Sequence, residues 1–284
     1  MYGVLIIIVI SLIIQEHQVI VTFLLSKRMS KNITISIITV VLNSVKTIKD
    51  TIESVISQDY KYIEHIIIDG GSADGTIDII KRYSNNIKYF TSEPDYGIYD
   101  AMNKGIKVAT GDIIGILNSD DFYPNNFIIS NIIKSFEKQN CDAIYGDLIY
   151  VKSNNISQVT RYWKSGQYSI SKIRNGWMLP HPTFFVKKDI YNRYGLYDTD
   201  LKSAADYEMI LRLLYKENIF VYYIPMILVN MRVGGKSNKS FWNRLLANHE
   251  DNIAWKKNKL DKPILVRFKK PLYKLKQFFL KPEV

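Results

Sequence analysis

Two adjacent carboxylates, Asp120 and Asp121, follow an apolar run at residues 113–117. A short apolar run bounded by turn residues predicts a strand buried on both faces, as in the middle of a parallel sheet. Ligands of open α/β sheets bind at the carboxyl ends of the strands. Neighbouring carboxylates repel each other unless a cation or hydrogen-bond donors offset their charge. The pair therefore predicts a divalent cation site that carries a diphosphate, or else an ordinary polar surface turn.

Three further predicted strands, at residues 33–41, 62–68 and 87–91, also end close to polar side chains. These side chains are Asn43, Asp69 and Asp95. Helices are predicted between the strands and after the fourth, at about residues 47–57, 77–83, 98–109 and 127–138. This alternation predicts a Rossmann-like α/β fold, with a mostly parallel central sheet and helices on both faces. Because so many polar residues mark strand ends, we favour a ligand site over a plain surface turn.

The turn at residues 69–76 bears glycine and lies between a predicted strand and a predicted helix. This layout is typical of nucleotide binding. The turn contains neither Gly-x-Gly-x-x-Gly nor a P-loop, which argues against a dinucleotide site and a Walker-type phosphate site. The alternating aspartates of an EF-hand loop are also missing.

The second half of the chain departs from strand and helix alternation. A strand at 143–150 and a hairpin partner at 157–163 precede a loop at 175–182, which contains His181. His181 is either structural or a contact for the acceptor or the diphosphate. A strand at 183–186, a helix at about 204–216 and a strand at 220–229 follow, and a basic, glycine-bearing loop at 231–237 comes last.

The bulk composition points to an anionic partner. The chain has 284 residues, 47% of them apolar, and a formal net charge of +11. Cys141 is the only cysteine, which argues against an intrachain disulfide framework and suits a reducing, cytoplasmic compartment. The 20 tyrosines occur without a basic repeat or an RNA-binding signature, so we expect no nucleic-acid partner.

Both ends of the chain differ from the middle. Residues 1–29 form an apolar extension that is a start-site artefact with translation from Met29, a membrane anchor, or a helix packed on the domain. Residues 241–284 form a basic tail, with ten Lys and Arg residues against two acidic ones from residue 256 onward, a net charge of +8. Apolar and aromatic residues alternate with these charges. We expect an amphipathic helical tail that lies on an anionic membrane surface, with an ordinary solvated helix end as the alternative.

Four stretches of the chain together resemble a known family. They are residues 36–43, 68–76, 93–105 and 117–121. In this order they resemble family 2 glycosyltransferases with the GT-A fold, and most of all the branch that builds bacterial capsule, colanic-acid-like exopolysaccharide and O-antigen. The resemblance runs from about residue 33 to 236. It implies a transferase domain at 30–240, with a nucleotide-binding half at 30–121 and an acceptor half at 122–240.

The resemblance implies roles for residues in the nucleotide-binding half. Thr39 and Val41 would line the base pocket, and Asp69 would accept a hydrogen bond from uracil or a similar base. The remaining nucleotide and donor-sugar contacts would be Asn43, Asp95, Asp100, Asn103, Lys104 and Asn118, the last of them to ribose.

The resemblance also implies the reacting groups. Asp120, with Asp121 beside it, would hold Mg²⁺ or Mn²⁺ against the diphosphate. Asp206 would act as the base that takes the acceptor hydroxyl's proton, and attack from the opposite face would invert the anomeric carbon. Separately from the resemblance, the basic, glycine-bearing composition of the loop at 231–237 predicts that Arg232 and Lys236 hold the diphosphate in a closing loop.

The expected protein is a metal-dependent inverting transferase that uses a nucleotide-sugar donor, with a UDP-sugar first. Its acceptor would be lipid-linked or an oligosaccharide, its pathway surface polysaccharide synthesis, and its location the inner face of the cytoplasmic membrane. Asn118 and Ala205 depart from the family pattern, where an aspartate and a glutamate are common. They leave open a catalytically silent scaffold subunit that binds the sugar nucleotide.

Overall fold

The computed structural model describes residues 32–234 and 241–263, the latter with side chains from residue 249 onward. Near the C-terminus it also describes residues 266, 269, 273, 275, 277–280 and 282. Contacts divide the chain into residues 1–33 and 34–284, and the fold below is that of the second unit. The predictions for residues 1–29 lie outside the described residues. Within the described part, no helix is both long and apolar enough to cross a membrane.

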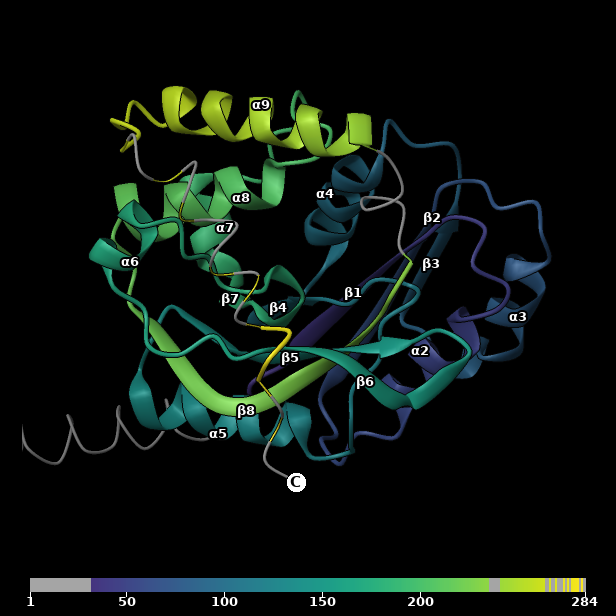
Figure 1. Cartoon of the computed structure of the whole chain (residues 1–284). Coiled ribbons are helices and arrows are strands. Elements are labelled where there is room, and N and C mark those ends of the chain that lie inside the picture. Colours follow the sequence, from purple (N-terminus) through teal and green to yellow (C-terminus); the bar gives the residue numbers. More distant parts are fainter. Residues whose placement is uncertain are drawn as a thin grey trace, which may run out of the picture. The chain divides into compact units, whose positions relative to one another are not determined.

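One eight-stranded sheet runs through the domain in the order β3-β2-β1-β4-β7-β5-β6, and β8 also pairs with β5 (Figure 1). Its strands are β1 (Ile35–Val41), β2 (Ile63–Asp69), β3 (Tyr89–Ser92), β4 (Ile113–Ile116), β5 (Ala143–Lys152), β6 (Asn155–Trp163), β7 (Phe185–Lys187) and β8 (Val221–Arg232). β1 is parallel to β2 and β4, β2 to β3, and β5 to β8. β7 is antiparallel to β4 and β5, and β6 to β5. The predicted α/β fold with a mostly parallel sheet is confirmed.

Helices cover both faces of the sheet, as expected. On one face α4 (Ile98–Val108) contributes Met102 and Ile106 to a cluster with Ile38 and Ile66 of the neighbouring strands. On the other face α2 (Ile48–Ile56) and α3 (Thr76–Arg82) pack against Val41 and Ile67. Because adjacent strand residues point to opposite faces, Ile66 and Ile67 belong to different clusters.

The described part of the chain also contains short helices, most of them in its second half, and two longer ones, α5 (Ile128–Gln139) and α9 (Phe241–Lys257). The short elements are η1 (Ser84–Asn86), α6 (Ile170–Arg174), η2 (His181–Thr183), α7 (Lys188–Tyr194), α8 (Ala205–Ile210) and η3, a π-helical segment (Leu211–Lys216). Sequence analysis predicted neither α6 nor α7. With five and seven residues, these helices span two turns at most and show the 3.6-residue period only weakly.

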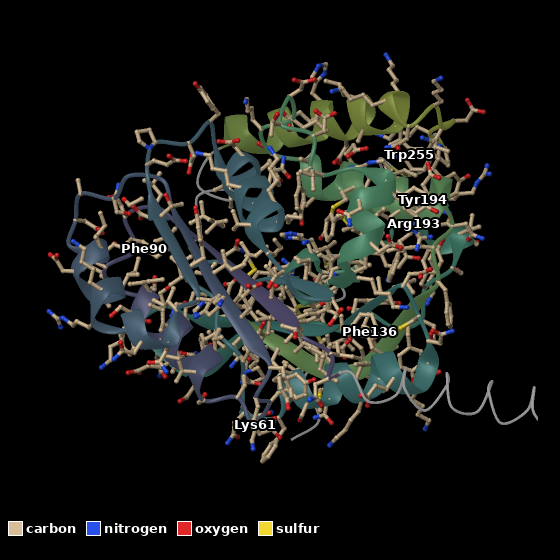
Figure 2. All side chains as sticks on the ribbon, turned by 180° about the vertical axis from the view of Figure 1, so that it is seen from behind. Lys61, Phe90, Phe136, Arg193, Tyr194 and Trp255 are labelled. Atoms are coloured by element: carbon tan, nitrogen blue, oxygen red, sulfur yellow. The ribbon has the colours of Figure 1, made fainter. Side chains whose placement is uncertain are left out.

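Helix α9 packs on the domain, although it lies in the segment predicted as a tail. Trp255 is 1% exposed, and its Nε1 donates a 2.9 Å hydrogen bond to the hydroxyl of Tyr207 on α8. Figure 2 shows Trp255 on the side of α9 that faces the rest of the domain. The boundary at residue 241 stays a prediction, and α9 is stabilised by contacts with the domain.

Strand β8 is longer than the sequence analysis predicted. Its pairing with β5 continues to the Val151 and Arg232 register, so Met231 and Arg232 lie in the strand. The prediction that Arg232 belongs to a loop at 231–237 is therefore wrong. Lys236 lies outside the described residues.

Candidate active site

Side-chain hydrogen bonds connect the loop after β1 and the start of α2 to the loop after β4. The hydroxyls of Ser44 and Ser119 lie 2.7 Å apart. Thr47 donates to the Ser119 carbonyl at 2.8 Å, and Thr51 donates to the Asp121 carbonyl at 2.7 Å. The strand ends that the sequence analysis singled out are thus joined at one edge of the sheet.

Asp69 organises the turn after β2. It is fully buried, and its Oδ2 accepts hydrogen bonds from the Gly71 and Ser72 amides at 3.1 and 2.9 Å and from the Ser92 hydroxyl at 2.6 Å. The Ser72 hydroxyl donates to Oδ1 at 2.5 Å. These bonds use most of the acceptor capacity of the carboxylate. In this structure Asp69 therefore supports the turn, and only Oδ1 has ready capacity for a further donor.

Asn43 connects the loop after β1 to the same turn. Its backbone amide donates to the Ser72 hydroxyl at 2.7 Å, and its side-chain Oδ1 accepts from the backbone amide of Ala73 at 3.0 Å. The backbone of Asn43 has a φ of 52°, a left-handed conformation that Asn adopts more readily than most residues. Asn43 is exposed and lies at the sheet edge, where the sequence analysis expected it.

Thr39 and Val41 are buried within β1. The Thr39 hydroxyl lies 3.0 Å from Nε2 of His65 on β2, and Val41 packs with Ile48 and Ile67. Burial lowers the pKa of His65 to about 4, so the ring is neutral near pH 7. Neither Thr39 nor Val41 presents a side chain to solvent, and their assignment to a base pocket stays a prediction.

Asp95 and Lys104 lie around the start of α4. The Asp95 carboxylate lies against the backbone of Gly70, where an added Cβ would come within 2.4 Å of Oδ2. Lys104 forms ion pairs with Glu93 at 2.9 Å and with Asp100 at 3.6 Å. The predicted Asp95, Asp100 and Lys104 therefore gather in one place, next to the turn after β2.

Asn118, Asp120 and Asp121 occupy the loop after β4. Asp120 is half-buried, and burial raises the pKa of its carboxyl. Asp121 is fully buried, and burial together with the Asp120 carboxylate raises the pKa of Asp121 well above its ordinary value. Asn118 Nδ2 donates to Asp121 Oδ2 at 3.2 Å. The two carboxylates therefore lie in unlike surroundings, with Asp120 nearer to solvent.

Two acceptor oxygens in this loop are buried without a donor. They are Asn118 Oδ1 and Asp121 Oδ1, for which the described part of the protein supplies no hydrogen bond. Such groups cost free energy unless they are paired. A hard divalent cation takes oxygen ligands, so the donor set of this loop fits one. Among the described residues, however, no three His, Cys, Asp or Glu side chains gather into a metal cluster.

Arg232 reaches this loop from the end of β8, but it is only 4% exposed. Its Nη1 donates to the Asp120 carbonyl at 2.9 Å, and its Nη2 forms an ion pair with Asp50. Its guanidinium also lies 4.7 Å from the centre of the Phe122 ring. In this structure Arg232 fixes the loop after β4 and does not extend toward solvent, where a diphosphate would be met.

Asp206 is half-buried at the start of α8, opposite the first turn of α4. Its Oδ1 accepts hydrogen bonds from the Tyr99 hydroxyl at 3.0 Å and from the Tyr207 amide at 2.8 Å. Oδ2 accepts none from the residues that the structure describes. Asp206 therefore has one anchored oxygen and one oxygen available to a substrate.

Two tyrosines and a histidine, in contact with one another, lie next to Asp206 in the interior of the domain. The rings of Tyr99 and Tyr197 stack with centres 5.7 Å apart at 23°. The Tyr197 hydroxyl lies 3.1 Å from Nε2 of His181, whose pKa is lowered by burial. Sequence analysis missed both tyrosines. Tyr99 stands in the 93–105 motif, but its regular helical spacing does not distinguish it from an ordinary core residue.

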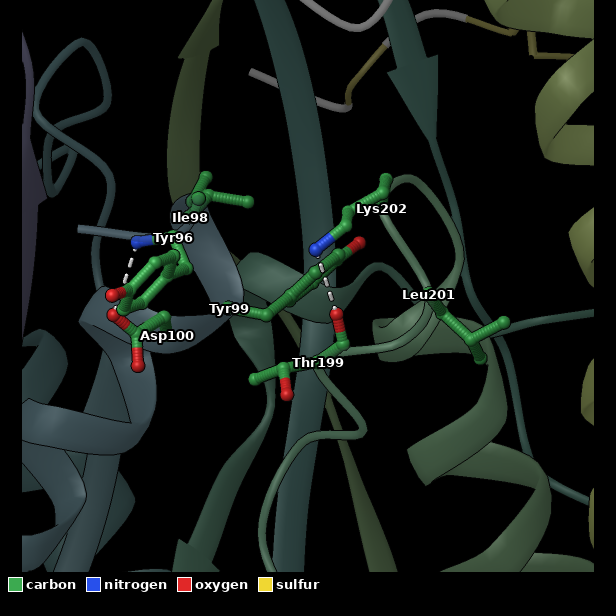
Figure 3. A pocket seen from close by; sticks show the side chains of 8 residues that line it. Tyr96, Ile98, Tyr99, Asp100, Thr199, Leu201 and Lys202 are labelled. Carbon is green, nitrogen blue, oxygen red and sulfur yellow. Dashed lines mark hydrogen bonds between the residues drawn. The ribbon is translucent and has the colours of Figure 1, made fainter.

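A pocket opens beside Tyr99, between the start of α4 and the loop before α8 (Figure 3). In this view Lys202 donates to the Thr199 carbonyl at 3.0 Å, and the Tyr96 amide donates to Asp100 at 3.1 Å. The lining residues are Tyr96, Gly97, Ile98, Tyr99, Asp100, Thr199, Leu201 and Lys202. Tyr96 is 86% exposed, so an aromatic face is available at the mouth of the pocket.

The chain is similar to proteins of one family. Residues 36–195 match the family described as Glycosyl transferase family 2. An uncharacterized glycosyltransferase of Mycobacterium tuberculosis is 32% identical over 182 residues, which are 63% of this chain and 68% of the relative. A PGL/p-HBAD biosynthesis glycosyltransferase of Mycobacterium bovis is 26% identical over 219 residues, which are 74% and 83% of the two chains.

Solved structures share the fold at lower identity. S. aureus TarS in complex with UDP matches with a TM-score of 0.63 and 18% identity, over 83% of this chain and 68% of that chain. The mannosyltransferase PcManGT from Pyrobaculum calidifontis, in complex with GDP-Man and Mn²⁺, matches with a TM-score of 0.61 and 16% identity, over 86% and 72%. In another TarS structure the match covers 42% of that chain, so this chain spans less than half of its length.

Proposed function

The chain belongs to glycosyltransferase family 2 and is a glycosyltransferase, and we propose that it moves a sugar from a UDP-sugar to a hydroxyl group of a lipid-linked or oligosaccharide acceptor. TarS binds UDP or UDP-GlcNAc in solved structures, and PcManGT binds GDP-Man with Mn²⁺. These neighbours support a nucleotide-sugar donor. The expected product is a surface polysaccharide.

The observation that carries this proposal is the carboxylate of Asp206. Its Oδ1 is held by Tyr99, while no described residue donates to Oδ2. A general base needs a fixed position and a free acceptor within reach of the substrate proton. A small pocket lies beside Tyr99, whose hydroxyl donates to Asp206. Asp206 is therefore suited to act as the base.

The proposed reaction is a single displacement. The acceptor hydroxyl gives its proton to Asp206 Oδ2 while its oxygen forms a bond to the anomeric carbon of the donor sugar. The bond between that carbon and the diphosphate oxygen breaks, and the nucleoside diphosphate leaves with the electron pair. Since the new bond forms opposite the breaking bond, the anomeric configuration inverts.

The donor would lie along the strand ends, with its base near Asn43 and Asp69 and its sugar near Asp95, Asp100 and Lys104. The loop of Asn118, Asp120 and Asp121 would hold Mg²⁺ or Mn²⁺, which supplies charge neutralisation to the leaving diphosphate. The two buried acceptor oxygens of Asn118 and Asp121 support this assignment. Arg232 would support this loop by its hydrogen bond to the Asp120 carbonyl.

A basic, aromatic C-terminal segment supports an acceptor at a membrane. From residue 256 onward the net charge is +8. Among the described residues of this segment, Leu275, Phe278, Phe279 and Leu280 are 44–84% exposed. Gln277 connects this segment to β6 by two hydrogen bonds. Its backbone carbonyl accepts from the Tyr162 amide at 3.0 Å, and its Oε1 accepts from Arg161 Nε at 2.7 Å. Apolar side chains beside clustered positive charge suit the inner, anionic face of the cytoplasmic membrane.

The test is release of nucleoside diphosphate from UDP-, GDP- and dTDP-sugars by the full chain, with a bacterial membrane extract as the acceptor. We expect release from a UDP-sugar with Mn²⁺ and none with EDTA. Binding of UDP without release from any donor would instead favour a silent scaffold subunit. Release that persists in EDTA would overturn the metal assignment.

A further inference from the structure

Tyr99 connects the two halves of the site. It lies in the first turn of α4, which follows the donor-side turn with Asp95, and its hydroxyl donates to Asp206 Oδ1 at 3.0 Å. The two residues are 107 positions apart in the sequence. Tyr99 is therefore a direct link between the donor side and the residue proposed as the base.

The position of Tyr99 is fixed by its contact with Tyr197. Its ring stacks on Tyr197, and Asn103, one turn along α4, bonds to both the amide and the carbonyl of Tyr197 at 3.0 and 2.9 Å. Arg212, in η3 directly after α8, donates to the Gly195 and Leu196 carbonyls at 3.0 and 2.7 Å. The segment that carries Tyr197 is thus fixed by both helices, which leaves Tyr99 little freedom to leave Asp206.

The electrostatics favour a neutral Tyr99 phenol, which can donate to Asp206. Burial and the Asp206 carboxylate raise the pKa of Tyr99, so its hydroxyl keeps its proton. The other titratable groups that face this pair are His181, Tyr197 and Glu250. Burial keeps His181 neutral, and Glu250 accepts the amides of Lys202 and Ser203 at 2.9 and 2.7 Å.

We propose that Tyr99 is the positioning residue of the base: its hydrogen bond fixes Oδ1 of Asp206 and leaves Oδ2 directed to the acceptor. This inference rests on the proposed role of Asp206. A hydrogen bond donated to a carboxylate stabilises its charged form, so its loss makes the base harder to deprotonate. Tyr99 touches no reacting atom in this scheme and acts through Asp206.

The test compares pH–rate profiles of the full-length wild type, Tyr99→Phe and Tyr168→Phe, with the donor that the panel identifies and membrane extract as the acceptor. Tyr168 is a matched control, because its hydroxyl also makes one hydrogen bond, at 2.6 Å to the Leu214 carbonyl. For Tyr99→Phe we expect the acid limb to move up by about one pH unit and kcat on the plateau to fall about tenfold. Tyr168→Phe should keep the wild-type acid limb.

A second readout does not depend on turnover. In protein labelled with ¹³C at the aspartate carboxyls, the signal missing from Asp206→Asn identifies Asp206, and its titration midpoint should rise in Tyr99→Phe. An acid limb and a midpoint that both stay at their wild-type positions in Tyr99→Phe would overturn the inference. If Asp206→Asn retains full transfer, the assignment of Asp206 as the base fails, whereas no release of nucleoside diphosphate by the wild type would refute the proposed function, so these failures are distinct from that of the inference.

Discussion

Asn103 and Tyr197 exchange two hydrogen bonds: Asn103 Nδ2 donates to the Tyr197 carbonyl at 2.9 Å, and the Tyr197 amide donates to Asn103 Oδ1 at 3.0 Å. Asn103 is 7% exposed, and the contact joins α4 to the segment before α8. The Asn103 amide is therefore committed to the protein. The sequence analysis placed it among the nucleotide contacts, an assignment that stays untested.

Asn103→Ala should lower stability more than nucleotide affinity. The change leaves a buried amide and a buried carbonyl of Tyr197 without partners, which costs about 2–3 kcal/mol in the free energy of unfolding. Urea denaturation measures this loss, and calorimetry with UDP measures the affinity. A large loss of UDP affinity with unchanged stability would return Asn103 to the nucleotide site.

The pair of Arg212 and Glu208 should stabilise the helix that bears Asp206. Glu208 is 4% exposed, and Arg212 Nε donates to its Oε1 at 3.0 Å. Arg212→Met leaves a buried carboxylate with one donor, Asn258, so we expect a loss of about 3 kcal/mol in the free energy of unfolding. Arg193, paired with Asp189 at the same spacing but on the surface, is the matched control. Arg193→Met should change the midpoint of thermal unfolding very little.

The buried His65 should make stability depend on pH. Its pKa is about 4 in the folded protein and about 6.5 when unfolded, so the unfolded state binds more protons between these values. The contribution of His65 to the free energy of unfolding is therefore fully present above pH 6.5. It decreases by about 3 kcal/mol as the pH drops toward 4. In His65→Gln, whose side chain can still bond to Thr39, this dependence of the free energy of unfolding on pH should vanish. Urea denaturation from pH 4 to 7 gives the slope of the free energy of unfolding against pH for the wild type and for the variant. Equal slopes would contradict the account.

The exposed C-terminal aromatic residues should bind anionic lipid. Replacing Phe278 and Phe279 by serine removes apolar surface, and we expect binding to phosphatidylglycerol-containing vesicles to fall about tenfold. Phe220→Ser is the control, because Phe220 is 54% exposed just before β8. Salt should weaken binding of the wild type. Vesicle co-sedimentation checks this, and equal binding to neutral phosphatidylcholine vesicles would argue against the anionic surface.

The strand ends could be predicted from the sequence because the signals are local. Apolar runs that stop at Asp69 or near Asp120 define buried strands and their carboxyl ends. In the structure the loops that follow both strands bond to the loop after β1. The parallel direction of the strands in the first half of the sheet follows from the same alternation, whereas their order was not predicted.

Contacts between distant residues could not be predicted in this way. The Tyr99 and Asp206 pair depends on how α4 packs near α8, and no local pattern encodes that packing. Thr39, in the motif at 36–43, and Arg232, in a predicted loop, were expected near the ligand, but the sequence does not tell where either side chain points in the fold. Thr39 bonds inside the sheet, and Arg232 is drawn into an ion pair with Asp50.

Asp206→Asn measured for both transfer and UDP binding tests the central claim most directly. Asparagine keeps the shape and the Tyr99 contact, since its Oδ1 can accept the same hydrogen bond, but it cannot take a proton. We expect transfer to fall at least about a hundredfold while the Kd for UDP stays within about twofold of the wild type. Transfer at the wild-type rate in Asp206→Asn would contradict the assignment of the base, and with it the mechanism proposed for this protein.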